Sequence, residues 1–380
     1  MRIAYISVAT PFSRASWSGI PWYSHREILR RFPDTHVLET PRLDLLTDRL
    51  AFAERLGVLV RRQPILTYHY TRLIEAQLER LRPDAIVAVA AAHKLAYINP
   101  KWPLIYAADA MYATIVDYYS KYANFSSGAR RRGNMVQRAL IERIDRALLC
   151  SQWAADAARE TYGMPPEKLR IVPMGANLDA DPGFEPPKPG QPLRLLFVGF
   201  AWERKGGPLL LEIWKALRAH DPLVELHIVG ASPAAARGLP GVVLHGRIDK
   251  SDRAAHARLS ELYRRASFFV MPSREEAFGI VFCEAAAFGR PSVAADTGGV
   301  GSVILDGDTG LLLPIDASPA EYAERILSVW RNPERHAAMC HAARRDYERR
   351  LNWSAWGDAV AEAIKAVAKS THSQPAGAAN

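Results

Sequence analysis

Cysteine is scarce in this sequence of 380 residues, which contains only Cys150, Cys283 and Cys340. Three widely spaced cysteines cannot form a disulfide framework, and none of them belongs to a C-x-x-C zinc pair. Structural disulfides are typical of oxidising compartments, so their absence points to a reducing one.

Long apolar runs are also absent. The longest, residues 85–92, ends at His93 and Lys94, whereas a membrane-spanning helix needs about 20 apolar residues. The opening residues, MRIAYISVAT, lack the apolar stretch and the cleavage site of a signal peptide. We therefore expect a cytoplasmic protein without a membrane-spanning segment.

Positive charge, in contrast, is in excess and unevenly distributed. The net charge is +9, and residues 1–180 hold 25 Lys and Arg against 17 Asp and Glu, whereas residues 181–380 hold 24 against 23. A basic half predicts an anionic partner, which can be a nucleic acid, a membrane surface or a phosphate-bearing substrate. No recognised nucleic-acid-binding motif accompanies the charge.

Short apolar runs alternate with helical patterns along the chain, which is typical of an α/β protein with parallel sheets covered on both faces. In the first half the runs are residues 2–8, 84–90, 103–107 and 146–150. In the second half they are residues 193–198, 224–229, 242–245, 267–271 and 292–294. The pattern predicts two doubly wound, Rossmann-like domains, with ligands at the carboxyl ends of their strands.

The segment 179–192, DADPGFEPPKPGQP, separates the two series with five prolines and two glycines. We therefore predict an N-terminal domain at 1–180 and a C-terminal domain at 193–350. A final helix at 351–370 is expected to cross back to the N-terminal domain.

The segment Pro272–Gly299 contains two acidic residues, Glu276 and Glu284, eight positions apart around an expected helix start at Gly279. The first glutamate then lies in the loop after a strand, and the second lies within the helix. Backbone N–H groups at that helix start favour an anion. A solvated pair of acids is the alternative interpretation.

The segment Phe197–Gly207, FVGFAWERKGG, joins a strand to a helix through a loop that carries Arg204 and Lys205. Cations at the N-terminus of a helix oppose the helix dipole, so their presence favours a phosphate site. The loop matches neither G-x-G-x-x-G nor G-x-x-x-x-G-K-[ST], which weakens dinucleotide and P-loop interpretations. Gly19 opens a helix after the first strand, where the backbone can approach a ligand closely.

These segments together resemble the retaining GT-B glycosyltransferases of family 4 (glycosyl transferases group 1). The resemblance covers nearly the whole chain and rests on E-x-F-G followed by a second Glu, on A-x-G-x-P at 287–291, on Gly298-Gly299 and on D-G-x-T-G at 306–310. It implies two Rossmann-like domains that face each other across a cleft. Residues 151–177 are similar to the family's last N-domain strand, helix and strand.

The resemblance also implies roles for individual residues. Glu284 holds the ribose hydroxyls and Glu276 the donor sugar. Lys205, with Arg204, binds the diphosphate. The backbone of Phe278, Gly279, Ile280 and Val281 is expected to contact the phosphate and the sugar. Gly19 is expected to lie over the diphosphate. The main chain at Arg247 and Ile248 is expected to hold the base.

Three positions depart from the family pattern. Phe200 stands where an Arg usually follows the strand's glycine, so Arg204 is expected to substitute for it. Ala108 precedes Asp109 where a His-Asp pair is common, and Asp109 stays a candidate sugar or acceptor contact. Ser302 replaces a frequent acid. The catalytic candidates are therefore Glu276, Lys205, Arg204 and Asp109.

The expected activity is that of a retaining, metal-independent hexosyltransferase in cell-surface polysaccharide or glycoconjugate biosynthesis. Its donor is a nucleotide sugar, its acceptor is a glycan or a lipid-linked molecule, and it needs no cofactor. Two D-x-D strings, at 179–181 and 306–308, are weak metal candidates because a linker and a turn explain them.

Other interpretations stay open. One is an epimerase or hydrolase of nucleotide sugars on the same fold, and another is a basic nucleic-acid-binding protein. The arginine run at 130–132 lies near Arg138, Arg143 and Arg146 in the sequence. With Arg61-Arg62 and Arg30-Arg31 it is a candidate patch of the N-terminal domain that faces a phosphate or an anionic membrane surface at the inner face. We expect a nucleotide sugar rather than a nucleic acid as the partner.

Overall fold

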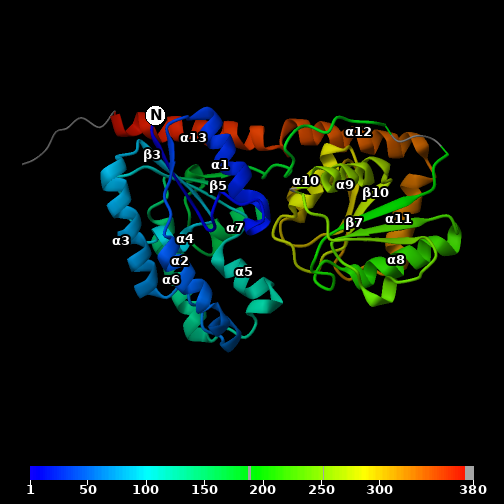
Figure 1. Cartoon of the computed structure of the whole chain (residues 1–380), viewed down its shortest axis with the longest axis horizontal. Coiled ribbons are helices and arrows are strands. Elements are labelled where there is room, and N and C mark those ends of the chain that lie inside the picture. Colours follow the sequence, from blue (N-terminus) through cyan, green and yellow to red (C-terminus); the bar gives the residue numbers. More distant parts are fainter. Residues whose placement is uncertain (187–189, 251, 373–380) are drawn as a thin grey trace, which may run out of the picture. The chain divides into compact units, whose positions relative to one another are not determined.

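The computed structural model describes residues 1–186, 190–250 and 252–372. It divides into two compact units, which are shown in Figure 1. Unit 1 is Met1–Pro173 together with the chain from Trp353 onward, and unit 2 is Met174–Asn352. Residues 187–189 of the proline-rich segment, and Ser251, where a helix was expected to begin, lie outside the described residues.

Unit 1 is built on a parallel sheet of six strands in the order β2-β1-β3-β4-β5-β6. The strands are β1 (Ile3–Ser7), β2 (Thr35–Val37), β3 (Ala85–Val89), β4 (Leu104–Ala108), β5 (Arg146–Leu149) and β6 (Leu169–Ile171). The helices are α1 (Ile20–Arg31), α2 (Pro41–Arg49), α3 (Pro64–Leu81), α4 (Ala92–Leu95), α5 (Tyr112–Tyr118), α6 (Ser127–Ile141), α7 (Gln152–Glu160) and α13 (Trp353–His372). The central strands β1, β3 and β4 are buried along their whole length, as a sheet covered on both faces requires.

Unit 2 has a second parallel sheet of six strands, in the order β12-β11-β10-β7-β8-β9. The strands are β7 (Arg194–Val198), β8 (Glu225–Val229), β9 (Val242–Gly246), β10 (Phe268–Met271), β11 (Ser292–Ala295) and β12 (Gly310–Leu313). The helices are α8 (Gly207–His220), α9 (Arg253–Arg265), α10 (Ile280–Ala287), α11 (Pro319–Trp330) and α12 (Pro333–Arg349). The two doubly wound parallel sheets confirm the α/β fold class expected from the sequence.

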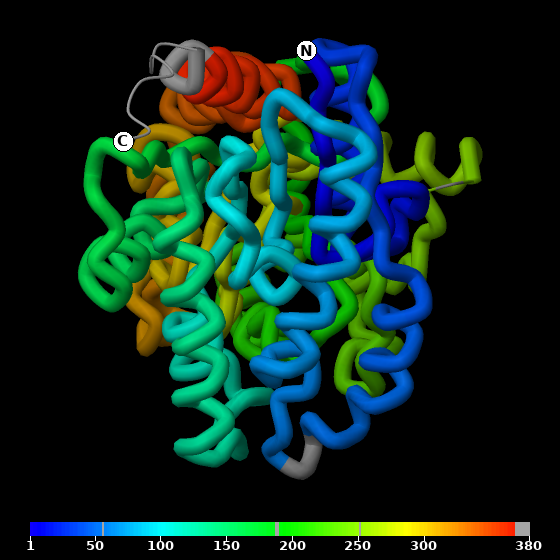
Figure 2. The backbone as a smooth tube through the Cα atoms, turned by 90° about the vertical axis from the view of Figure 1, so that its left-hand side faces the viewer, coloured from blue at the N-terminus to red at the C-terminus, as the bar shows by residue number. Residues whose placement is uncertain are grey.

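The last helix, α13, packs against α1 in unit 1, and Figure 2 shows it beside the N-terminal strand. Arg31 of α1 donates to Asp358 of α13 at 2.7 Å, and the rings of Tyr23 and Trp353 stack at 6.2 Å. Unit 1 therefore contains chain from both ends of the sequence.

The order of the strands fixes where each unit can bind a ligand. In unit 2 the neighbours β7 and β10 are the two strands from which the chain winds in opposite directions, and β1 and β3 are the equivalent pair in unit 1. Ligands of open α/β sheets bind outside the carboxyl ends of strands at such a switch point. Arg204 and Lys205 follow β7, and Glu276 follows β10, so the sequence candidates lie at the switch point of unit 2.

Candidate functional site

Three loops meet at the carboxyl edge of the sheet in unit 2, after β7, β10 and β11. The backbone N–H of Arg274 donates to the carbonyl of Arg204 at 2.9 Å, and the N–H of Gly299 donates to the carbonyl of Glu276 at 3.2 Å. These bonds link each loop to the next. Side chains from distant parts of the sequence are thereby held in one place.

The centre of this site is an ion pair between Lys205 and Glu276. Nζ of Lys205 lies 2.6 Å from Oε2 of Glu276, and the two side chains are only 15% and 11% exposed. The nearest nitrogen of the Arg204 guanidinium lies 3.9 Å from the same carboxylate oxygen, and it donates to the carbonyl of Glu275 at 2.5 Å. The structure thus brings together three of the residues that the sequence nominated.

Two glycines allow the Lys205 loop to lie this close to its neighbours. Gly206 has φ +75°, and a Cβ atom there would stand 1.8 Å from the carbonyl oxygen of Pro272. A Cβ on Gly199 would stand 2.8 Å from Cδ of Lys205, so the lysine stem lies against that glycine. A side chain at either position would displace the loop or the lysine.

The helix α10 begins beside the ion pair. Gly279 is its N-cap with φ +85°, and a Cβ there would stand 2.5 Å from the ring of Phe282 and 3.2 Å from Cγ of Glu276. The first N–H groups of a helix, here from Ile280 and Val281, have no partner within the helix and form its positive end. Phe278 precedes this start and is buried. The predicted helix start at Gly279 is therefore confirmed.

Glu284 occupies a second and separate position, one turn further along α10. Its side chain is 1% exposed, and Nζ of Lys250 lies 2.5 Å from its Oε1. The hydroxyl of Tyr263 donates to its Oε2 at 3.1 Å. Burial raises the pKa of Tyr263 well above its usual range, and the neighbouring Glu284 charge adds to this effect. Tyr263 therefore stays protonated and remains a donor.

Sequence reasoning missed Lys250 and Tyr263. Tyr263 lies in α9, and its ring stacks on Phe288 with centroids 5.1 Å apart and an angle of 5° between the planes. Lys250 follows the base-binding candidates Arg247 and Ile248 by only a few residues, which was the only signal available. Their convergence on Glu284 depends on how α9 packs against α10.

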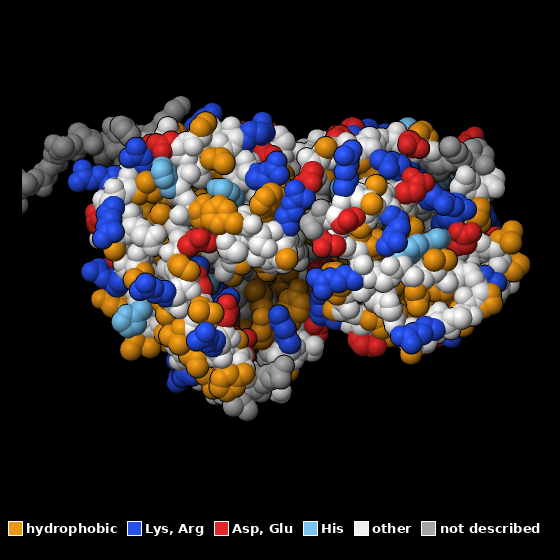
Figure 3. Space-filling model, viewed as in Figure 1, with side chains coloured by type: hydrophobic (Ala, Val, Ile, Leu, Met, Phe, Trp, Pro, Cys, Tyr) orange, Lys and Arg blue, Asp and Glu red, His pale blue; other side chains and the backbone are white. Residues whose placement is uncertain are grey.

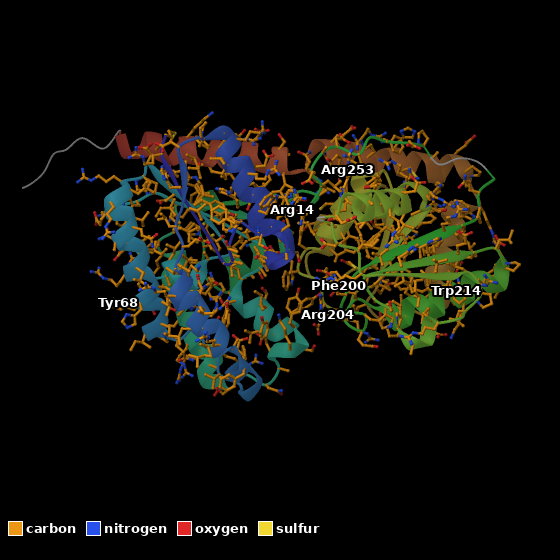
Figure 4. The ribbon with its side chains drawn as sticks, in the orientation of Figure 1. Arg14, Tyr68, Phe200, Arg204, Trp214 and Arg253 are labelled. Atoms are coloured by element: carbon orange, nitrogen blue, oxygen red, sulfur yellow. The ribbon has the colours of Figure 1, made fainter. Side chains whose placement is uncertain are left out.

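Arg247 and Ile248 directly follow β9. The guanidinium carbon of Arg247 lies 5.4 Å from the ring centroid of Phe200, and Ile248 is buried. Phe200 is 67% exposed, and Figure 4 shows it close to Arg204. An aromatic ring thus occupies the position where the family resemblance leads one to expect an arginine, and it contacts the segment expected to hold the base.

The remaining two candidates, Gly19 and Asp109, lie in unit 1. Gly19 caps α1 with φ +82°, and Trp17 and Ser18 before it also have positive φ values, 43° and 55°. Such conformations are rare outside glycine and mark a strained turn. Asp109 directly follows β4, and its carbonyl accepts from the thiol of Cys150 at 3.7 Å.

The two D-x-D strings have structural partners. Asp181 accepts from the Arg344 guanidinium at 2.6 Å, and Asp306 accepts from Arg325 at 2.9 Å. Among the residues that the structure describes, no group of three or more His, Cys, Asp or Glu side chains is placed to hold a metal ion. Hydrogen bonds within the fold therefore explain why these aspartates are present.

The basic run on α6 is partly used inside unit 1. Arg130 pairs with Asp117, and Arg138 donates to the carbonyl of Thr161 at 3.0 Å. On the face drawn in Figure 3, Lys and Arg side chains are interspersed with acidic and hydrophobic ones. Within the described ranges, no helix combines the length and apolar character needed to cross a membrane.

Comparison with known proteins identifies the family. Residues 26–180 match the family described as Glycosyltransferase Family 4, and residues 192–332 match Glycosyl transferases group 1. A D-inositol 3-phosphate glycosyltransferase of Segniliparus rotundus is 28% identical over 60% of this chain and 53% of its own length. The chain thus spans about half the length of this curated relative.

Two solved structures share the fold. Sucrose-phosphate synthase of Thermosynechococcus elongatus superposes with a TM-score of 0.70 at 19% identity, covering 97% of this chain and 100% of its own. Anabaena Alr3699/HepE, solved in complex with UDP, gives 0.67 at 17% identity, with coverage of 96% and 100%. The two Rossmann-like units are those of the GT-B fold, and the chain belongs to the group 1 glycosyltransferases of family 4.

Proposed function

We propose that this protein transfers a hexosyl group from a nucleoside diphosphate sugar to a glycan or lipid-linked acceptor, with retention of configuration. The observation that carries the proposal is the Lys205–Glu276 pair, with Arg204, at the switch point of unit 2. A cation beside a carboxylate suits a ligand that presents both an anion and hydroxyl groups.

The relatives support the same conclusion. One is named a D-inositol 3-phosphate glycosyltransferase, and a protein of the same fold is solved with UDP bound. The first name describes a protein that transfers a sugar, and the second structure contains a bound nucleotide. The donor base and the transferred sugar are left open in our proposal.

Donor binding is proposed to proceed by exchange of partners. The diphosphate takes the place of Glu276 at the Lys205 ammonium, because the diphosphate as a whole carries more negative charge than one carboxylate and accepts more hydrogen bonds. Glu276 is then free to accept hydrogen bonds from the sugar hydroxyls. In the same way, the ribose hydroxyls compete with Lys250 for Oε1 of Glu284, while Tyr263 keeps Oε2 in place.

The chemical step breaks the bond between the anomeric carbon and the diphosphate oxygen. Negative charge develops on the leaving diphosphate, and Lys205, Arg204 and the start of α10 stabilise it from fixed positions. The acceptor hydroxyl attacks the oxocarbenium-like carbon from the face that the diphosphate leaves, and its proton passes to the departing phosphate oxygen. Retention follows without a covalent enzyme intermediate.

Thermal denaturation with UDP, GDP, ADP and their sugars tests the proposal, because a ligand that binds only the native protein raises its melting temperature. We expect one nucleotide series to stabilise the protein. Product analysis should then show transfer to a hydroxyl acceptor, with the anomeric configuration of the donor preserved. Stabilisation by none of the nucleotides would contradict the proposal.

Metal independence needs its own measurement. The positive charge needed at the diphosphate is supplied by Lys205, Arg204 and the helix terminus, so activity should survive EDTA. Loss of activity in EDTA that Mn²⁺ restores would show that the side chains do not suffice. Wild-type protein that has been dialysed against EDTA and then returned to buffer is the control.

A further inference from the structure

Unit 1 contains a polar cluster that the proposed transfer mechanism does not use, formed by the part-buried Arg62 and the buried His93 and Gln137. Arg62 precedes α3, His93 lies in α4 and Gln137 lies in α6, three helices that pack on one another in unit 1 (Figure 1). Arg62 is hydrogen-bonded to Gln137, and its charge acts on His93, so the three groups lie in one region of unit 1.

Arg62 is held by uncharged groups. Its guanidinium donates to Oε1 of Gln137 at 3.3 Å and lies 4.6 Å from the ring centroid of Tyr112. No carboxylate of the described chain pairs with it. Burial lowers the pKa of Arg62 from its ordinary value, but a guanidinium keeps its charge in proteins.

The position of Tyr112 is itself built into the fold. A Cβ atom on Gly133 of α6 would stand 2.0 Å from the Tyr112 ring, so the ring approaches the backbone of that helix closely. Tyr112 is 3% exposed. The ring on which Arg62 lies is therefore itself packed against α6.

The other two members of the cluster have unused hydrogen-bonding atoms. Within residues 1–186, 190–250 and 252–372, Nε2 of His93 and Nε2 of Gln137 are buried and have no hydrogen-bond partner. His93 is 4% exposed and Gln137 is 1% exposed. A buried polar group without a partner loses its hydration without compensation, so a ligand that satisfies it recovers that loss.

The neighbouring cations differ from Arg62. Arg61 pairs with Asp48, and Lys94 lies 3.0 Å from Asp44. Burial lowers the pKa of His93 well below its ordinary value, and the charges of Lys94, Arg61 and Arg62 add to the effect. The imidazole is therefore neutral, and it can donate one N–H bond without adding charge.

The location agrees with a binding role. His93 follows β3, which neighbours β1 at the switch point of unit 1. Between β3 and α4 lies Ala90, with a φ of +50°. Positive φ values at residues other than glycine store strain and gather at functional sites.

We propose that Arg62, Gln137 and His93 bind a phosphate monoester on the acceptor. Arg62 supplies the charge and up to two parallel hydrogen bonds, and the two unpartnered nitrogens donate to the remaining oxygens. The identification of the ligand as an acceptor rests on the proposed function. Phosphate binding at this cluster can be tested without assuming that function. Arg62 is part-buried, whereas His93 and Gln137 are buried, so the ligand is proposed to reach the cluster along the Arg62 side chain.

Glycerol 3-phosphate, titrated calorimetrically into the full chain, is the probe. All proteins in the experiment carry Lys205→Met, so that phosphate binding in unit 2 does not contribute. We expect saturable binding that Arg62→Gln weakens by about tenfold or more, because a charged hydrogen-bonded partner is lost.

Arg61→Gln is the matched control, because it removes the same charge one residue away from a side chain that already pairs with Asp48. It should change the affinity by no more than about twofold, as expected for a partly exposed charge. Gln137→Leu keeps the volume and the charge of the cluster and should weaken binding by about threefold or more through its lost donor. Melting temperatures of all variants report whether each is folded.

Vesicles of phosphatidic acid in phosphatidylcholine distinguish a lipid headgroup from a soluble phosphate. Arg62-dependent binding to either probe supports the inference and identifies the source. Equal loss in Arg61→Gln and Arg62→Gln, or wild-type binding in folded Arg62→Gln and Gln137→Leu proteins, would overturn it. Failure of the protein with Lys205 intact to transfer sugar, with phosphate binding retained, would count against the proposed function alone.

Discussion

The two units share a doubly wound sheet, but the cation at the proposed ligand site is held differently in each. In unit 2 Lys205 and Lys250 each face a carboxylate, at 2.6 Å and 2.5 Å. In unit 1 Arg62 is held by an amide oxygen and an aromatic ring. The same architecture therefore presents a neutralised cation in one unit and an unneutralised one in the other.

This difference has a consequence for ligands. An anion that binds Lys205 must replace Glu276, and the released carboxylate then needs donors such as sugar hydroxyls. An anion that meets Arg62 replaces no acid. Unit 2 is thus suited to a ligand that carries anion and hydroxyls together, and unit 1 to an anionic group alone.

The largest expected effect comes from removing the lysine of the unit 2 pair. Lys205→Met should lower kcat for donor turnover by about 100-fold, the usual size for a lost group that stabilises the transition state. Steady-state kinetics with the stabilising nucleotide sugar measure it. Lys215→Met, at an exposed lysine of α8 paired with Glu212, is the control. Comparable losses of kcat in both variants would show that Lys205 acts only through the overall charge of the protein and not at the diphosphate.

A smaller effect is expected where α10 begins. Gly279→Ala places a methyl group against the Phe282 ring at positive φ, which should shift the start of the helix and raise the donor KM by about tenfold. Gly238→Ala is the control, because Gly238 also has a positive φ but no described atom lies within 4 Å of the added Cβ. This variant therefore measures the effect of backbone strain alone. If both variants bind donor alike, the helix start is not a ligand contact.

The hydrogen bond that fixes Glu284 should matter less. Tyr263→Phe removes the donor to Oε2 and leaves the ring stacking, so we expect a threefold to tenfold rise in the Kd for nucleotide, in line with about 1 kcal/mol for one hydrogen bond. Tyr322→Phe is the control, because the buried hydroxyl of Tyr322 has no partner among the residues described. Unchanged Kd in Tyr263→Phe would remove Tyr263 from the site.

The smallest expected effect is on stability in acid, and it involves the part-buried His245 of unit 2 and the buried His93 of unit 1. Burial lowers the pKa of His245 to about 4, with the charges of His227 and Arg258 adding to it, and burial also lowers the pKa of His93 in unit 1. The unfolded chain binds these protons first. Stability is therefore full above the unfolded pKa, about 6.5, and falls as the pH drops from there toward 4.

Urea unfolding at pH 7 and pH 5 measures this effect. His245→Gln should reduce the stability lost between the two pH values by about 1 kcal/mol, discounted for the partial exposure of the ring. His220→Gln, at an exposed residue of α8, is the control and should leave the loss unchanged. An acid sensitivity of His245→Gln equal to that of wild type would show that His245 does not titrate on unfolding.

Apolar patterning predicted most of the fold. The strands β1, β3, β4 and β5 lie within a residue or two of their predicted bounds, because buried central strands are continuous apolar runs. The short edge strands β2 and β12 were missed. An edge strand of three or four residues leaves too little periodicity to separate it from a loop.

The sequence predicted those candidate residues that belong to a short motif, because such residues are close together along the chain. Lys205 and Glu276 were nominated separately, and their contact across 71 residues became visible only in the structure. Arg62 and Gln137 are 75 residues apart, and neither belongs to a recognisable motif. Charge and helical pattern give no information on which side chains from different helices will meet.

The placement of α13 has a consequence for how the protein is made. Because α13 completes unit 1 beside α1, a ribosome must translate all of unit 2 before unit 1 gains its last helix. Unit 2 is continuous in sequence and has all of its own strands by then. Nascent chains that stop before Trp353 therefore expose the face of α1 that α13 covers, and chaperones would meet that face during synthesis.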